Sequence, residues 1–101
     1  MAGELRWTDD HCHLPDDGSV DEVLAAAREA GVERFVHVGT DLASSRTAMA
    51  LAAAHDGVWA TAGVHPHEAR HGIAGIEELL SDPSCVAVGE CGFDFHYDHS
   101  P

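Results

Sequence analysis

The alternation of short apolar runs with helix-forming segments constrains the fold of this chain most strongly. Runs of strand type occur at residues 5–14, 34–38, 58–64 and 85–90. Segments with helical spacing or an alanine-rich composition separate them, at residues 20–30, 42–55 and 75–81. This β-α-β-α-β-α-β order, with a repeat of roughly 25 to 28 residues, predicts an α/β fold whose parallel strands are joined by right-handed crossovers.

Residues between these segments predict where helices begin and end. Ser19 stands three residues before Glu22, a spacing that predicts a capping box at the start of the first helix. Gly31 occupies the position of a left-handed residue after that helix. Ser100-Pro101 has the form of another helix start, so we expect residues 1–101 to be one partial domain, truncated before a further crossover helix.

Charge and histidine content narrow the function. Eighteen acidic residues stand against five arginines and no lysine, for a formal net charge of −13. A protein that grips duplex DNA through its phosphates normally carries a basic patch, whereas these arginines are scattered singly. Nine histidines in so acidic a chain instead suggest a metal site.

The cysteines and the hydropathy pattern bear on location. The three cysteines include no CxxC pair, which predicts reduced thiols rather than disulfides or a cysteine-rich zinc site. No run approaches the roughly 18 apolar residues of a membrane span, and no signal-peptide pattern opens the sequence. We therefore expect a cytoplasmic protein with no membrane partner.

Two histidines lie near the C-terminal end of the first predicted strand. His11 and His13 point to one face because strand side chains alternate, and Asp9 shares that face. Two imidazoles placed in this way can converge on one ion. A single HxH motif also fits solvated histidines, so this pair alone leaves both interpretations open.

Two further polar clusters follow later strands, at the ends where parallel α/β folds place their sites. In the GVHPH segment, Pro66 restricts the backbone and so orients His65. In the last strand Val86, Val88 and Glu90 share one face, so Glu90 ends a buried apolar row as a carboxylate. A cation explains a buried carboxylate, and a surface glutamate beyond a frayed strand is the alternative.

The other histidines and cysteines have structural interpretations. His37, between two valines of a strand, is predicted to be a satisfied core histidine. Cys12 and Cys91 are out of phase with the candidate ligands, which predicts small residues packed under helices rather than metal ligands. The remaining histidines of the later loops are predicted to be solvated, namely His67, His71, His96 and His99.

Three segments, in this order and spacing, resemble the TatD family of metal-dependent deoxyribonucleases. They are DDHCHL at residues 9–14, GVHPH at residues 63–67 and GECGFD at residues 89–94, and VGTD at residues 38–41 also resembles the family. The resemblance implies a hydrolase of the amidohydrolase superfamily with a TIM barrel fold. Residues 1–101 would then be the N-terminal half of that barrel, with four strands and three helices.

The same resemblance implies roles for individual residues. His11 and His13 would hold one divalent ion, Glu90 would contact or bridge two, and Glu90 and His65 would be catalytic. The cofactors would be Mg²⁺ or Mn²⁺, or else Zn²⁺, with two ions per complete site. The substrate would be mostly DNA, attacked from its 3′ end. Metal ions can bind phosphate without a basic patch, which removes the objection raised by the acidic charge.

The family pattern continues beyond the fourth strand, with two more metal-binding histidines and an aspartate on strands that this sequence lacks. We therefore expect an incomplete site, weak metal binding, little exonuclease activity from this chain alone, and self-association through open sheet edges. Whether His96 or His99 replaces a missing ligand stays open. The alternatives are a metal-dependent esterase or deacylase of the same fold, acting on another ester, and a non-catalytic half-barrel that assembles with itself or another chain.

Overall fold

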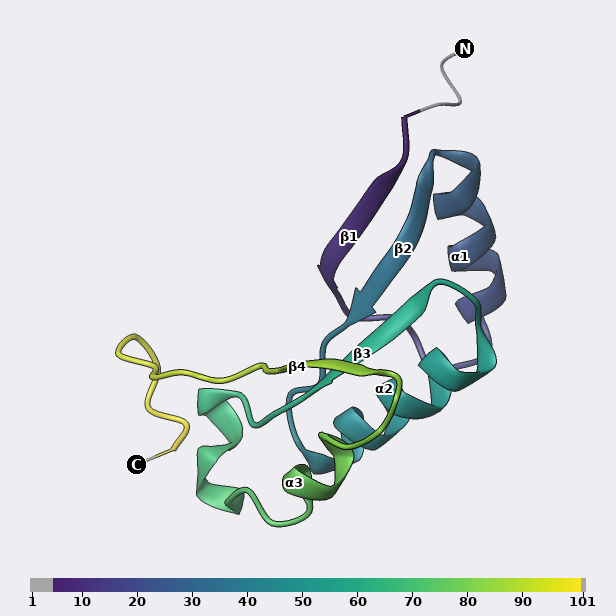
Figure 1. Cartoon of the computed structure of the whole chain (residues 1–101). Helices are drawn as coiled ribbons and strands as arrows, with labels where there is room; N and C mark the ends of the chain where they lie inside the picture. The colour runs from purple at the N-terminus through teal and green to yellow at the C-terminus, as the bar shows by residue number, and fades with distance from the viewer. Residues whose placement is uncertain (1–4, 101) are drawn as a thin grey trace.

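A computed structural model describes residues 5–100, which form one parallel sheet with its connecting helices (Figure 1). The sheet is four-stranded, with neighbours in the order β1-β2-β3-β4 and every pairing parallel. This order confirms the predicted α/β fold and gives the arrangement of half a barrel. The elements in chain order are β1 (Trp7–Cys12), α1 (Val20–Glu29), β2 (Val32–His37), α2 (Leu42–Ala54), β3 (Val58–Ala62), the 3-10 helix η2 (Pro66–His71), α3 (Ile76–Leu79) and β4 (Cys85–Val88).

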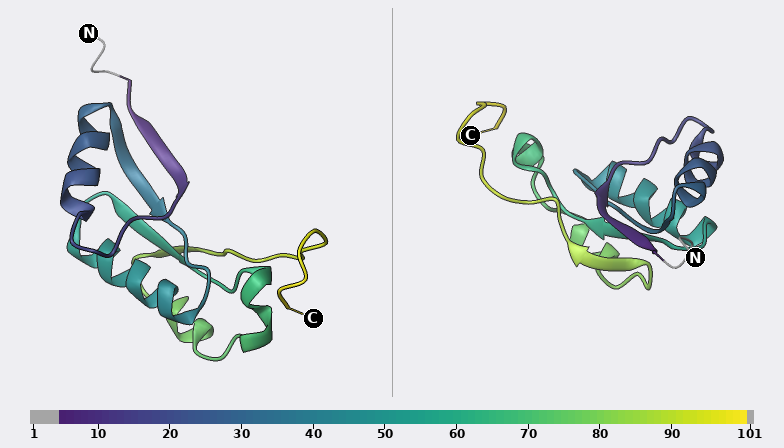
Figure 2. Two further views of the ribbon diagram at one scale, coloured as in Figure 1. Left: turned by 180° about the vertical axis from the view of Figure 1, so that it is seen from behind. Right: turned by 90° about the horizontal axis from the view of Figure 1, so that it is seen from above.

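The long helices α1 and α2 lie on the same side of the strands (Figure 2). α1 packs on β2 and α2 on β3. On the opposite face Trp59, which alternates with buried neighbours on β3, is 43% exposed. No helix among residues 5–100 is long and apolar enough to cross a bilayer. The core between helices and sheet is formed by Val20, Leu24, Phe35, Ala48, Met49, Ala52, Val58, Ala60, Ala62 and Ile76.

The helix ends match the predictions in part. The Ser19 side chain makes no capping hydrogen bond because its hydroxyl donates to Asp17 at 2.6 Å, so the predicted capping box is wrong. Gly31 has φ of 101°, in the left-handed region, as predicted. A capping box that we did not predict lies at the start of α2. The Asp41 side chain accepts a hydrogen bond from the Ser44 amide, and the Ser44 hydroxyl accepts one from the Asp41 amide.

Three strands end two residues earlier than predicted. β1 ends at Cys12, β3 at Ala62 and β4 at Val88. Beyond these points the chain leaves the sheet, and the polar residues that follow form loops. His13, Glu90 and the GVHPH histidines therefore lie just past the strands that position them, while His11 lies on β1 itself.

The predicted buried row on β4 is wrong. Val86 and Val88 are 52% and 62% exposed because β4 is an outer strand of the described sheet. Val88 lines a hollow beside α3 with Ile76 and Leu80, whereas Glu90 lines a separate hollow among histidines. Val88 and Glu90 do not share a face, since the regular alternation stops where the strand stops.

The segment that follows β4 runs out past η2 (Figure 1). It is tied to η2 at Ser100, whose hydroxyl donates to the His67 carbonyl at 2.9 Å and accepts from the Arg70 amide at 3.2 Å. The predicted helix start at Ser100-Pro101 includes Pro101, which lies outside the described residues.

Candidate metal centre

The segment after β2 gathers the candidate site residues. Three successive backbone carbonyls, at positions 38, 39 and 40, accept hydrogen bonds from the His13 ring, the Glu90 amide and the His65 amide. The donor–acceptor distances are 3.1, 2.7 and 2.7 Å in that order. One short stretch of backbone thus holds the segments that leave β1, β4 and β3 in a fixed relation.

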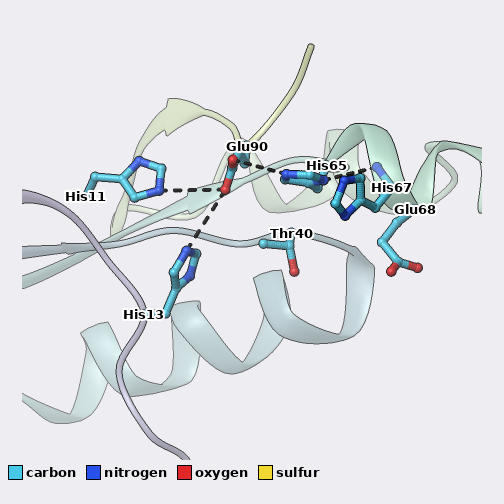
Figure 3. A pocket seen from close by; sticks show the side chains of 7 residues that line it. All are labelled: His11, His13, Thr40, His65, His67, Glu68 and Glu90. Carbon is cyan, nitrogen blue, oxygen red and sulfur yellow. Dashed lines mark hydrogen bonds and ion pairs between the residues drawn. The ribbon is translucent and has the colours of Figure 1, made fainter. Parts of the chain in front are cut away.

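The side chains of His11, His13 and Glu90 converge at this point (Figure 3). His11 Nε2 lies 3.6 Å and His13 Nε2 4.0 Å from Glu90 Oε2, and one ligand atom from each residue lies within 4.8 Å of the others. The predicted convergence is therefore confirmed, while the role of these residues as metal ligands stays a prediction. Within residues 5–100 they form the single such group, so neither His96 nor His99 joins it.

Hydrogen bonds determine which ring nitrogen could bind an ion. His13 Nδ1 donates to a carbonyl, so in the neutral ring Nε2 has a free lone pair facing Glu90. His65 has the opposite arrangement, because its Nδ1 accepts from the His67 amide at 3.0 Å. Its Nε2 therefore carries the hydrogen and lies 3.3 Å from Glu90 Oε1. His13 is suited to binding an ion, and His65 to holding a proton beside the carboxylate.

These side chains line a hollow of about 370 Å³ together with residues to which the sequence interpretation gave no role (Figure 3). Thr40 belongs to the VGTD segment, and Glu68 lies on η2. The signal for η2 was present in the sequence. Pro66 suits the first position of a helix, and the side chain of His65 caps it by accepting from a backbone amide.

His67 also lines this hollow, which corrects its interpretation as an incidental loop histidine. Its ring packs 4.3 Å from that of His65, and its Nε2 contacts the Asp94 carboxylate. Hydrogen bonds from the amides of Tyr97 and His96 hold the pKa of Asp94 below its usual range. Asp94 is thus ionised at neutral pH and fixes the orientation of the His67 ring.

Of the three cysteines, Cys12 and Cys85 are partly buried and Cys91 is exposed. Cys12 packs against the core, its Sγ donates to the Val36 carbonyl, and burial, with a smaller effect from Asp9, raises the pKa of this thiol to about 11. It remains protonated at neutral pH and is a poor metal ligand. Cys91 is exposed, so its predicted packing under a helix is wrong, because it lies in the segment beyond β4.

His37 is buried, as predicted, with 5% of its surface exposed. It is not satisfied, because its Nδ1 has no hydrogen-bond partner among the described residues. Burial and then the nearby His13 ring lower the pKa of His37, and Asp16 opposes them. The neutral form of this ring is therefore the one that the fold accommodates.

We expect folding stability to fall as the pH drops below about 6.5, because the unfolded chain then protonates His37 before the folded chain does. This one group can contribute a slope of at most about 1.4 kcal/mol per pH unit. Urea unfolding at several pH values measures the slope. His37→Asn should make this slope shallower. The same slope in His37→Asn and the unmodified protein would contradict this assignment.

Comparison with known proteins agrees with the resemblance of the sequence motifs. Residues 8–101 match the family described as TatD related DNase. A protein named 3′-5′ ssDNA/RNA exonuclease TatD from Edwardsiella piscicida is 49% identical over 83 residues, which are 77% of this chain and 32% of that protein. Proteins of the same name from Cronobacter turicensis and Escherichia coli are 44% identical over 88 residues (83% and 34%) and 43% identical over 84 residues (79% and 32%). The chain spans about a third of the length of these curated relatives.

Proposed function

Since this chain belongs to the TatD related DNase family, we propose that it carries part of the site of a metal-dependent hydrolase that removes nucleotides from the 3′ end of single-stranded nucleic acid. The observation that carries the proposal is the convergence of His11, His13 and Glu90, with His65 facing the second oxygen of the same carboxylate. The substrate class follows the name of the relatives, which are exonucleases of single-stranded DNA and RNA.

The donor set at the centre fits a divalent cation. His11 and His13 offer imidazole nitrogens and Glu90 offers a carboxylate oxygen. Mixed nitrogen and oxygen ligands suit Zn²⁺ or Mn²⁺, whereas Mg²⁺ prefers oxygen ligands and its own water. A bound divalent ion would supply Lewis-acid polarisation of the phosphodiester and a lowered pKa for water.

Glu90 and His65 have different roles beside the proposed ion. The Glu90 carboxylate is partly buried, and its Oε2 faces the two candidate ligands, so it can orient a water and accept its proton. The Nε2–H of His65 lies beside the other oxygen of the carboxylate, where it can orient Glu90 or donate a hydrogen bond to a phosphate oxygen of the substrate. These positions support the assignment of Glu90 and His65 as catalytic residues.

Because the protein is acidic, a cation should strengthen the binding of a phosphate at the metal centre. A phosphate in the hollow would meet Glu90 and Glu68, in a protein with a formal net charge of −13. A cation between carboxylate and phosphate reverses that repulsion.

We further propose that the protein acts in the cytoplasm, where its three unpaired thiols would stay reduced. We also propose that the open edges at β1 and β4 promote self-association.

An assay of 3′ trimming tests the function. Single-stranded DNA and RNA labelled at the 5′ end are incubated with the protein and Mn²⁺, and EDTA is then added. We expect slow trimming that stops with EDTA, since three protein ligands leave the other coordination positions to water. Glu90→Gln should abolish the trimming, whereas His71→Asn, at the surface, should not alter it.

Two outcomes would contradict this proposal. Trimming that continues in EDTA, or that survives in Glu90→Gln, would show that another protein or another site cleaves the strand. Hydrolysis of p-nitrophenyl acetate that needs the metal ion and is lost in Glu90→Gln, without hydrolysis of bis(p-nitrophenyl) phosphate, would favour the esterase alternative. Light scattering on the same preparation reports whether the active species is a monomer or an assembly.

A further inference from the structure

A second hollow adjoins the metal centre and has no role in the chemistry above. Its volume is about 380 Å³, and it lies between η2 and the segment that follows β4. It shares His65, His67 and Glu90 with the first hollow. A ligand held at Glu90 could therefore extend directly into this second hollow.

Three exposed aromatic residues lie on the segment that follows β4. Phe93, Phe95 and Tyr97 are 88%, 96% and 56% exposed, at every second position of the segment. The rings of Phe93 and Phe95 lie 6.2 Å apart, inclined by 30°, and Phe93 and Tyr97 line the hollow itself. Large aromatic surface of this kind is a cost to a free protein in water unless it is used for binding.

A row of rings connects these aromatics to the metal centre. Tyr97 lies 5.6 Å from His67 and His67 lies 4.3 Å from His65, measured between ring centroids. His65 in turn lies against Glu90. The row places planar ring surface beside the position proposed for the scissile phosphodiester.

Hydrogen bonds hold the segment in this position. The Asp94 carboxylate accepts from the amides of His96 and Tyr97 at 2.8 and 2.9 Å, which fixes the turn between the aromatic residues. Farther along, the Arg70 guanidinium donates to the His99 carbonyl at 2.9 Å. The aromatic residues are therefore presented by an anchored loop, and less ordering is required when a ligand binds.

We propose that residues 93–97 form a stacking subsite for a nucleobase next to the phosphodiester that is cleaved. This inference rests on the proposed function, and it deepens that function by naming how the strand is held. Aromatic rings stack on any base, which suits an exonuclease that must accept every sequence. Stacking also needs no positive charge, in a chain with no lysine and a net charge of −13.

Binding without hydrolysis tests the subsite. Fluorescence anisotropy in EDTA compares a 5′-fluorescein oligothymidine with a matched strand that is abasic at its three 3′-terminal positions. We expect the complete strand to bind at least about fivefold more tightly. Phe93→Ala and Phe93→Leu should remove this preference, and Phe93→Tyr should keep it. Ile73→Ala, at an exposed apolar residue of another hollow, is the matched control and should bind as the unmodified protein does.

Salt provides a second readout. A protein that holds phosphates with basic side chains loses affinity as salt rises. Here the protein and the DNA strand are both negatively charged, and added NaCl screens their repulsion. The affinity of the protein for the strand should therefore stay constant or increase between about 50 and about 300 mM NaCl. A loss of affinity with salt, or equal binding of the complete and abasic strands, would overturn the stacking proposal.

The outcomes separate this proposal from the function it rests on. If Phe93→Ala binds like the unmodified protein while Mn²⁺-dependent trimming proceeds, the subsite is wrong and the exonuclease stands. If base-dependent binding is lost in Phe93→Ala but no divalent ion supports trimming, the subsite stands and the function is wrong. If Phe93→Ala instead turns an assembly into monomers by light scattering and leaves base-dependent binding intact, the surface is an interface between copies and the proposal fails.

Discussion

Glu90→Gln will weaken divalent-ion binding by at least about tenfold while leaving the fold intact. Glutamine has nearly the volume of glutamate but carries no charge, so the two imidazoles would be left as the only strong ligands of the group. The backbone of this residue keeps its hydrogen bond to the Gly39 carbonyl, since that bond uses the amide. Calorimetric titration with MnCl₂ and ZnCl₂ measures the change, and circular dichroism checks the fold.

The hollow offers a matched control for this substitution. Glu68→Gln removes a carboxylate that lines the same hollow but lies outside the converging group, so it should change ion affinity little. His11→Ala should reproduce the loss seen in Glu90→Gln. An equal loss in Glu68→Gln would show that ions bind to the acidic surface in general. Tight stoichiometric binding abolished by His11→Ala would show that three ligands suffice, contrary to the weak binding that we expect.

The positions of His11 and Glu90 were predictable because they follow from local patterns. Apolar runs separated by helical spacing indicate parallel strands, and the carboxyl ends of parallel strands meet at one edge of a sheet. Residues near those ends must then come together, whatever the details of packing. The GVHPH and GECGFD segments could be assigned to one site for this reason before any contact was known.

The arrangement that holds them was not predictable. The carbonyls at positions 38–40 hold the site segments, and two of their three donors are backbone amides, which leave no trace in residue type. Neighbouring side chains also compete for the same hydrogen-bonding group. Ser19 precedes Glu22 as a capping box requires, yet its hydroxyl donates to Asp17 instead. Asp41, which lacks a glutamate three residues later, does cap its helix, through a reciprocal bond with Ser44.

Gly63→Ala will destabilise the fold and disrupt the metal centre together. A Cβ at this position would lie 2.3 Å from the Gly89 carbonyl carbon and 2.7 Å from the Glu90 oxygen, both backbone atoms. The end of β4 must then move away from β3, which breaks the bonds from the Gly89 amide to the Ala62 carbonyl and from the Thr61 hydroxyl to the Gly89 carbonyl. Overpacking and the lost hydrogen bonds together should cost about 3 kcal/mol or more.

Thermal unfolding and ion titration on the same variant measure both effects. A loss of that size should lower the melting temperature by roughly 12 °C or more in a chain of this length. Gly89→Ala is the control, because the nearest atom to its Cβ would be Thr61 Oγ1 at 3.9 Å, an ordinary contact. Melting of Gly63→Ala at the temperature of the unmodified protein would mean that β3 and β4 are not in close contact there. Since Glu90→Gln should weaken ion binding without lowering the melting temperature, the two variants separate the chemistry of the carboxylate from the backbone contact that positions it.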